Sequence, residues 1–177
     1  MKYTKEFKEI VELGAFIGNG NPNSKILIVG KEAATEIKEG VNEELEKKNL
    51  KSLSNNSSDW KKNIENNISQ KDIENWSLEK RENNPLFAFK GTVKKHTSDT
   101  WKKYQKLYDV IFKGEINRNN ELELDFQEYF FITEMSEIPS KTTNDAQKKV
   151  TFSQKLQHRK NTFFKSEFVQ NFPVIVL

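Results

Sequence analysis

The sequence contains no cysteine, and only two histidines, four prolines and seven glycines among its 177 residues. Without cysteine the chain can form no disulfide, no thiolate zinc site and no cysteine-ligated iron–sulfur cluster. The two histidines, His96 and His158, are too far apart in the sequence to form a metal-binding motif. We therefore expect neither a bound metal nor another cofactor.

Long apolar segments are also missing. No apolar run is long enough to span a bilayer, and the first residues, MKYTKEFKEIVEL, form an amphipathic segment unlike a signal peptide. We expect a cytoplasmic protein that does not associate with a membrane. Hydrophobic residues make up 34% of the chain, charged residues 31%, and the net charge is +3. This mild positive excess permits contact with nucleic acid without requiring it.

Three short apolar segments predict the strands of a sheet, and they are residues 26–29, 129–133 and 174–177. Helical spacing of apolar residues predicts helices over residues 3–13, 33–48, 98–114 and 151–171. Because buried strands alternate with helices, we expect the strands to be parallel. The sequence therefore predicts an α/β fold, a three-layer α/β/α sandwich with a short parallel sheet, formed by one domain over residues 1–177.

Two segments depart from this regular order. Residues 49–84 are rich in Asn, Ser, Lys and Glu, which predicts a polar insertion with one or two short, poorly buried helices. The last predicted strand ends at Leu177, and an apolar strand is an unusual end for a chain. We expect either that the sequence is truncated and belongs to a longer protein, which we favour, or that another subunit covers this sheet edge.

The turn after the first predicted strand is the most informative segment, because ligands bind at the carboxyl ends of strands in open α/β sheets. Gly30 ends this strand, and neither G-x-G-x-x-G nor G-x-x-x-x-G-K-[ST] follows it. A dinucleotide or nucleoside triphosphate site is therefore not indicated. The segment carries a carboxylate instead, Glu32, which can orient a water molecule when it is partly desolvated. Alternatively, Glu32 only complements the dipole of the following helix.

The order of these segments resembles the uracil-DNA glycosylase superfamily, and in particular its uncharacterised bacterial relatives. In one branch, an apolar strand is followed by Gly-Glu-Ala-Pro-Gly. Here the strand and Gly30 are followed by Lys-Glu-Ala-Ala at residues 31–34, with one residue inserted and no Pro-Gly. The family's second strand ends in Thr-Asn with a proline downstream, which resembles residues 133–134 and Pro139. A helix that leads to a proline and an apolar strand resembles residues 157–177.

The resemblance implies a role for several residues. Glu32 would position the hydrolytic water. Gly30, Phe87 or Phe89, and Glu134 would bind the flipped base, with one phenylalanine ring stacked on it and Glu134 at its hydrogen-bonding edge. The family has Asn at this last position, and an amide both donates and accepts, whereas an ionised carboxylate only accepts. Glu134 therefore argues against recognition of uracil.

The resemblance and the local charge also suggest contacts with DNA. Arg159 and Lys160 would bind phosphates, although such charges are more often the solvated face of an amphipathic helix. The family's later His-Pro-Ser type loop would lie beyond Leu177. The first hypothesis is a DNA glycosylase-like hydrolase that cleaves the N-glycosidic bond of a flipped base. The alternatives are a non-catalytic nucleic-acid or nucleotide-binding module on the same scaffold, and an interaction domain whose C-terminal strand pairs with a second copy or another chain.

Overall fold

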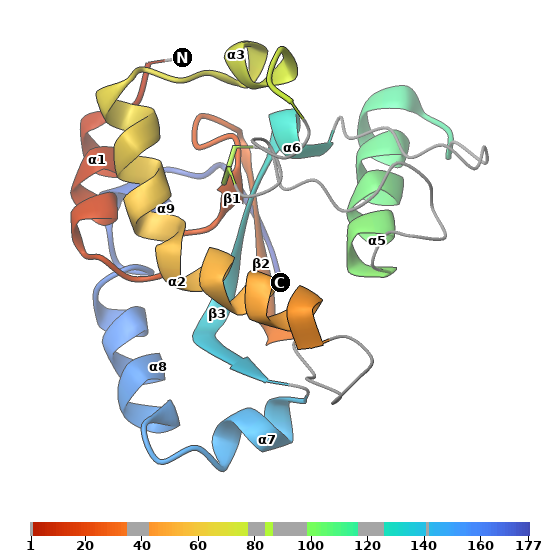
Figure 1. Ribbon diagram of the computed structural model, residues 1–177. Helices are drawn as coiled ribbons and strands as arrows, with labels where there is room; N and C mark the ends of the chain where they lie inside the picture. The colour runs from red at the N-terminus through yellow and green to blue at the C-terminus, as the bar shows by residue number, and fades with distance from the viewer. Residues whose placement is uncertain (1, 35–42, 78–83, 87–98, 117–125, 141) are drawn as a thin grey trace.

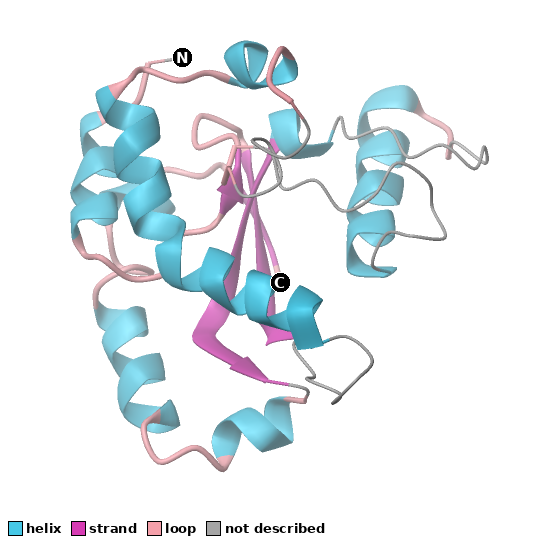
Figure 2. Ribbon diagram, in the orientation of Figure 1, coloured by secondary structure: helices cyan, strands magenta, loops and turns pink. Residues whose placement is uncertain are grey.

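The computed structural model describes residues 2–34, 43–77, 84–86, 99–116, 126–140 and 142–177. These residues form a mixed α/β fold, in which a four-stranded sheet has helices on both faces (Figure 1, Figure 2). In chain order the elements are α1 (Lys5–Glu12), β1 (Asn19–Gly20), β2 (Ile26–Ala34), α2 (Glu43–Glu65), α3 (Gln70–Glu74), α5 (Asp99–Tyr108), η2 (Asp109–Lys113), α6 (Phe126–Tyr129), β3 (Phe130–Ser140), α7 (Thr143–Gln147), α8 (Phe152–Asn161), α9 (Glu167–Gln170) and β4 (Val174–Val176).

The sheet has the strand order β1-β3-β2-β4. The strands β2, β3 and β4 correspond to the three predicted apolar segments, and β2 is parallel to both of its neighbours, as expected. Strand β1 was not predicted, because it consists of only Asn19 and Gly20, in a segment with the composition of a loop. It pairs with β3 in the antiparallel direction. The sheet is therefore mixed, and the prediction of a wholly parallel sheet is corrected at this edge.

Both faces of the central strands are buried, which explains why their sequences are continuously apolar. On one face, Leu27, Val29 and Phe131 pack with apolar residues of α1, α2 and α9. On the other face, Ile28 and Ile132 pack with residues of α5 and α6. Alternate residues of one strand thus supply two separate cores.

The described part of residues 49–84 belongs to the first of these cores. Trp60 of α2 is fully buried, its ring packs edge-on against Phe7 at 4.9 Å, and its Nε1 donates to the carbonyl of Gly18 at 2.9 Å. Ile73 of α3 is also buried, at 1% exposure. The buried amide of Asn56 donates to Gly18 O and accepts from the backbone N–H of Ile17 and Gly18. The prediction of a poorly buried insertion is therefore wrong for this part, because a few apolar residues on the buried side of a helix suffice to anchor it.

Several boundaries also differ from the prediction. Strand β2 continues past Gly30 to Ala34, so the backbone of Glu32 lies in the strand and not in a loop. The last predicted helix is two helices, α8 and α9, and Ser166 caps the second through its hydroxyl. Strand β4 lies at the edge of the sheet, and its first two side chains are 47% and 46% exposed. No helix in the described ranges has the length and apolar character that crossing a membrane requires.

Candidate functional site

The carboxyl ends of β2 and β3 lie side by side at one edge of the sheet (Figure 1). Gly30 is in register with Glu134, and Glu32 is in register with Ser136, two residues further along the same pair of strands. The register is irregular between Glu32 and Ala34, as expected where a strand pair bends. The backbones of three residues that the sequence predicted for the site, Gly30, Glu32 and Glu134, therefore lie side by side on β2 and β3. Gly30 and Glu134 are near the middle of these strands, before their carboxyl ends at Ala34 and Ser140.

Gly30 provides the space that the Glu134 side chain occupies. A Cβ atom at position 30 would lie 2.0 Å from Oε2 of Glu134, far inside van der Waals contact. The backbone of Gly30 does not have a positive φ, so the requirement for glycine is one of space and not of conformation. The two residues thus form one unit in which the glycine determines where the carboxylate lies.

We expect Gly30→Ala to move the Glu134 carboxylate without unfolding the chain. The atom in the way is the far end of a flexible side chain, which can change rotamer, and alanine suits a strand interior better than glycine. The free energy of unfolding should therefore change by no more than about 1 kcal/mol. A crystal structure of the variant, with urea denaturation alongside, tests this. An unmoved Glu134 side chain, or a loss of several kcal/mol, would contradict it.

Tyr104 of α5 approaches the same carboxylate from the second core. Burial raises the pKa of Tyr104 to about 12, and the negative charge of Glu134 is the smaller cause. The ring of Tyr104 also packs near the rings of Trp101 and Phe126, each with a centroid distance of 6.2 Å. At neutral pH its hydroxyl is therefore protonated and available as a donor. Tyr104 belongs to the helix predicted over residues 98–114, and nothing in the local sequence indicates its proximity to Glu134.

Arg159 supports this edge from the opposite face of the sheet. It is only 2% exposed, and its guanidinium donates to Glu134 O at 3.0 Å, to Thr133 Oγ1 at 2.8 Å and to Phe16 O at 2.5 Å. Its guanidinium carbon lies 4.2 Å from the centroid of the Phe163 ring. The hydroxyl of Thr133 accepts from Arg159 and in turn donates to Ile17 O at 2.7 Å, so the hydrogen-bond network extends to the loop before β1.

The environment of Arg159 argues against the phosphate contact predicted for it. Burial lowers the pKa of Arg159 to about 10, and the charges of Glu137 and Glu134 oppose that shift. Even so, the guanidinium is protonated at neutral pH. A side chain that is inside the molecule and bonded to three protein oxygens is not placed to bind a phosphate at the surface. The phosphate-binding assignment of Arg159 is corrected to a structural one, in which it holds β3 at Thr133 and Glu134.

The neighbouring Lys160 is exposed, and it belongs to a basic segment that follows β3. Between residues 142 and 166 the chain has one acidic residue, Asp145. The exposed basic side chains of this segment are Lys148, Lys149, Lys155, Lys160 and Lys165. Lys155 forms an ion pair with Glu137 of β3 at 3.2 Å, which ties α8 to the strand. The phosphate contact of Lys160 stays a prediction, and this segment is the surface on which it would occur.

The remaining sequence-predicted residues are only partly described. Phe87 and Phe89 lie outside the described residues, so their predicted stacking role stays a prediction. For Glu32 the structure places the backbone in β2, opposite Ser136.

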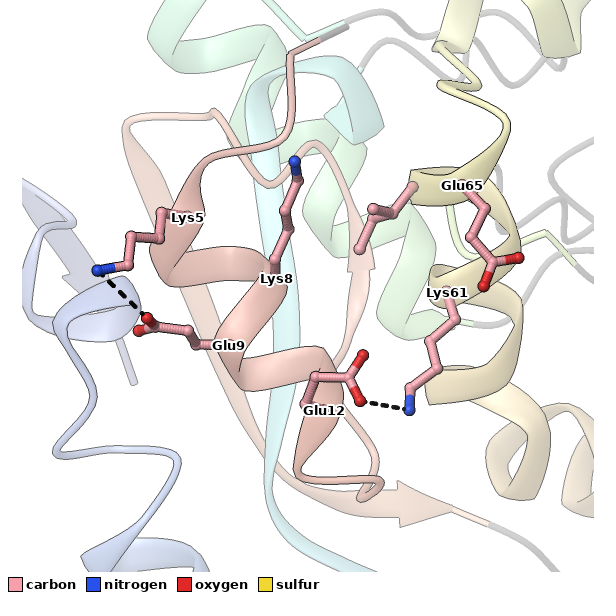
Figure 3. A pocket seen from close by; sticks show the side chains of 7 residues that line it. Lys5, Lys8, Glu9, Glu12, Lys61 and Glu65 are labelled. Carbon is pink, nitrogen blue, oxygen red and sulfur yellow. Dashed lines mark hydrogen bonds and ion pairs between the residues drawn. The ribbon is translucent and has the colours of Figure 1, made fainter.

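A groove on the other face of the sheet is a separate feature. It lies between α1 and α2, has a volume of about 280 Å³ and is lined mostly by lysine and glutamate side chains (Figure 3). The ion pair of Lys61 with Glu12, at 2.7 Å, joins α2 to α1 across the groove. The ion pair of Lys5 with Glu9, at 3.6 Å, lies within α1. Since its charges compensate one another and α1 packs on the face away from Tyr104, this groove is not part of the candidate site.

Among the described residues, no three His, Asp or Glu side chains gather in a way that could hold a metal ion. Comparison of the chain with protein-family models, with curated proteins and with solved structures gives no match.

Proposed function

We propose that this chain is a uracil-DNA glycosylase-like protein that binds a nucleic-acid strand at the carboxyl ends of β2 and β3 and hydrolyses the N-glycosidic bond of a flipped base. The observation that carries the proposal is the pairing of Gly30 with Glu134, which places a carboxylate on β3 just beyond the part of β2 that pairs with β4. This is the side toward the carboxyl ends of the strands, where parallel α/β sheets bind ligands. Glu32 lies two residues after Gly30 on β2, the strand that pairs with the strand of Glu134.

The architecture supports this proposal in general terms. Three parallel strands with helices on both faces agree with the three-layer α/β/α arrangement that the resemblance implies. The basic segment of residues 142–166 follows the carboxyl end of β3, the strand that carries Glu134 (Figure 1). A single-stranded or locally opened polynucleotide that lies along these lysines would bring its bases toward that strand.

The proposed reaction divides the work between the two carboxylates. Glu32 would hold a water molecule, whose oxygen attacks C1′ of the sugar. The bond between C1′ and the base nitrogen breaks, its electron pair leaves with the base, and the proton of the water passes to Glu32 and then to solvent. Glu134 would hold the edge of the flipped base, while the sequence-predicted ring of Phe87 or Phe89 stacks on its face.

The test is a base-excision assay with Glu32→Gln. Labelled single- and double-stranded oligonucleotides that carry one uracil, hypoxanthine, xanthine or guanine are incubated with the protein, and alkali-labile cleavage is measured. We expect cleavage of at least one substrate and a loss of about 100-fold or more in the variant, the usual contribution of a general base. Glu12→Gln, which changes a carboxylate on the far face of the sheet, is the matched control and should cleave normally.

Two outcomes would contradict parts of this proposal. Cleavage that is equal in Glu32→Gln would remove Glu32 from the mechanism. No cleavage, with binding that weakens as salt rises, would favour the second candidate, a non-catalytic nucleic-acid-binding module. The exposed lysines of residues 142–166 are the observation that favours that candidate.

A further inference from the structure

The backbone of Glu134 is fixed in β3, and Gly30 provides the space in which its side chain lies. Its carbonyl oxygen accepts from Nε of the buried Arg159, and its residue pairs with Gly30 across the two strands. Gly30 leaves the volume that the carboxylate occupies, so a larger residue there would displace it. A group that is positioned from its own backbone and from the neighbouring strand is suited to select a ligand by hydrogen bonding.

The chemistry of a carboxylate restricts what it can select. When ionised it has two acceptor oxygens and no donor, so a well-matched partner presents two N–H groups side by side. Among the common bases, only guanine does this on its Watson–Crick edge, through N1–H and the exocyclic amino group. Adenine and cytosine place an acceptor nitrogen next to their amino group, and uracil flanks its single N–H with two carbonyl oxygens. Each of these would set an acceptor against a carboxylate oxygen.

We propose that Glu134 makes this site selective for a guanine-type base. This inference rests on the proposed function, because it assumes that a nucleic-acid base reaches the edge formed by β2 and β3. It goes beyond the proposed function by naming the class of base and the residue that selects it. Lesions of guanine that keep N1–H and the amino group belong to the same class.

The experiment compares single-stranded oligonucleotides of one sequence that differ only at the central base, which is guanine, hypoxanthine, adenine or uracil. Hypoxanthine is the sharpest probe, because it differs from guanine only by the missing amino group. We measure equilibrium binding by fluorescence anisotropy at several salt concentrations. The oligonucleotide with guanine should bind about 10- to 100-fold more tightly than that with hypoxanthine, the usual value of one hydrogen bond to a charged group.

Two variants connect this preference to Glu134. Glu134→Gln keeps the shape of the side chain and gives it a donor, and Gly30→Ala keeps the carboxylate but displaces it. Both should bind guanine and hypoxanthine with similar affinity, while the salt dependence that the lysines produce stays unchanged. Glu12→Gln, on the far face, should keep the full preference for guanine. Circular dichroism confirms that each variant is folded before it is compared.

The outcomes separate this inference from the proposed function. Salt-sensitive binding with equal affinity for all four bases, or a preference for guanine that survives in both variants, would overturn the role of Glu134 and leave nucleic-acid binding intact. Absence of binding to every oligonucleotide would overturn the inference and the proposed function together. A preference for guanine that both variants lose would establish the inference, whether or not the chain cleaves the base.

Discussion

Replacing Arg159 with methionine should lower the free energy of unfolding by about 3–5 kcal/mol, because three acceptor oxygens inside the molecule would lose a charged donor. Methionine fills much of the same volume, but it cannot donate to Glu134 O, Thr133 Oγ1 or Phe16 O. Each of these buried acceptors would lose a partner, at a cost of about 1–3 kcal/mol apiece in the least favourable case. Urea denaturation followed by circular dichroism measures the change.

The control for Arg159→Met is its neighbour on the same helix. Lys160 is exposed, so Lys160→Met should change the free energy of unfolding by no more than about 0.5 kcal/mol. Arg159→Lys should fall between the two, because one ammonium group cannot reproduce three hydrogen bonds made in different directions. If Arg159→Met lowered the free energy of unfolding as little as Lys160→Met, the guanidinium would have no structural role. That result would favour the phosphate contact predicted from the sequence.

The comparison of these two residues shows what the sequence could and could not reveal. Both belong to the segment Gln157-His-Arg-Lys160, in which nothing distinguishes a buried cation from an exposed one. Arg159 is buried because three oxygens from β3 and from the loop before β1 converge on it, and such convergence depends on tertiary structure. The strands themselves were predictable, because their apolar runs reflect burial on both faces of the sheet.

The candidate site was predictable to a similar, limited extent. Parallel strands bring their carboxyl ends to the same end of a sheet, so the predicted strand direction placed Gly30 and Glu134 at one end of it. That β2 and β3 are neighbours was not predicted. Their register did not follow from the strand direction, nor did the continuation of β2 through Glu32, since a polar strand end resembles a loop in the sequence. The approach of Tyr104 depends on how α5 packs against the sheet, which no local pattern determines.

Trp60→Ala should be as damaging as the loss of Arg159, with a decrease of about 3–5 kcal/mol in the free energy of unfolding. The indole is fully buried, and its ring contacts those of Phe7 and Phe131. Its Nε1 also donates to Gly18 O, so the alanine variant loses a hydrogen bond in addition to creating a cavity. Thermal and urea unfolding of the purified chain provide the measurement.

Two further variants divide this effect into its parts. Trp60→Phe keeps most of the apolar volume and removes only the donor and part of the ring, so we expect a smaller loss, about 1–3 kcal/mol. Trp76→Ala changes the other tryptophan of the polar segment, which is only partly buried at the edge of the same core, and should cost less than Trp60→Ala. Equal, small effects of Trp60→Ala and Trp76→Ala would mean that α2 is loosely attached, as its polar composition alone suggests. A large difference between the two variants would mean instead that the buried ring of Trp60 holds α2 against α1 and the central strand β3.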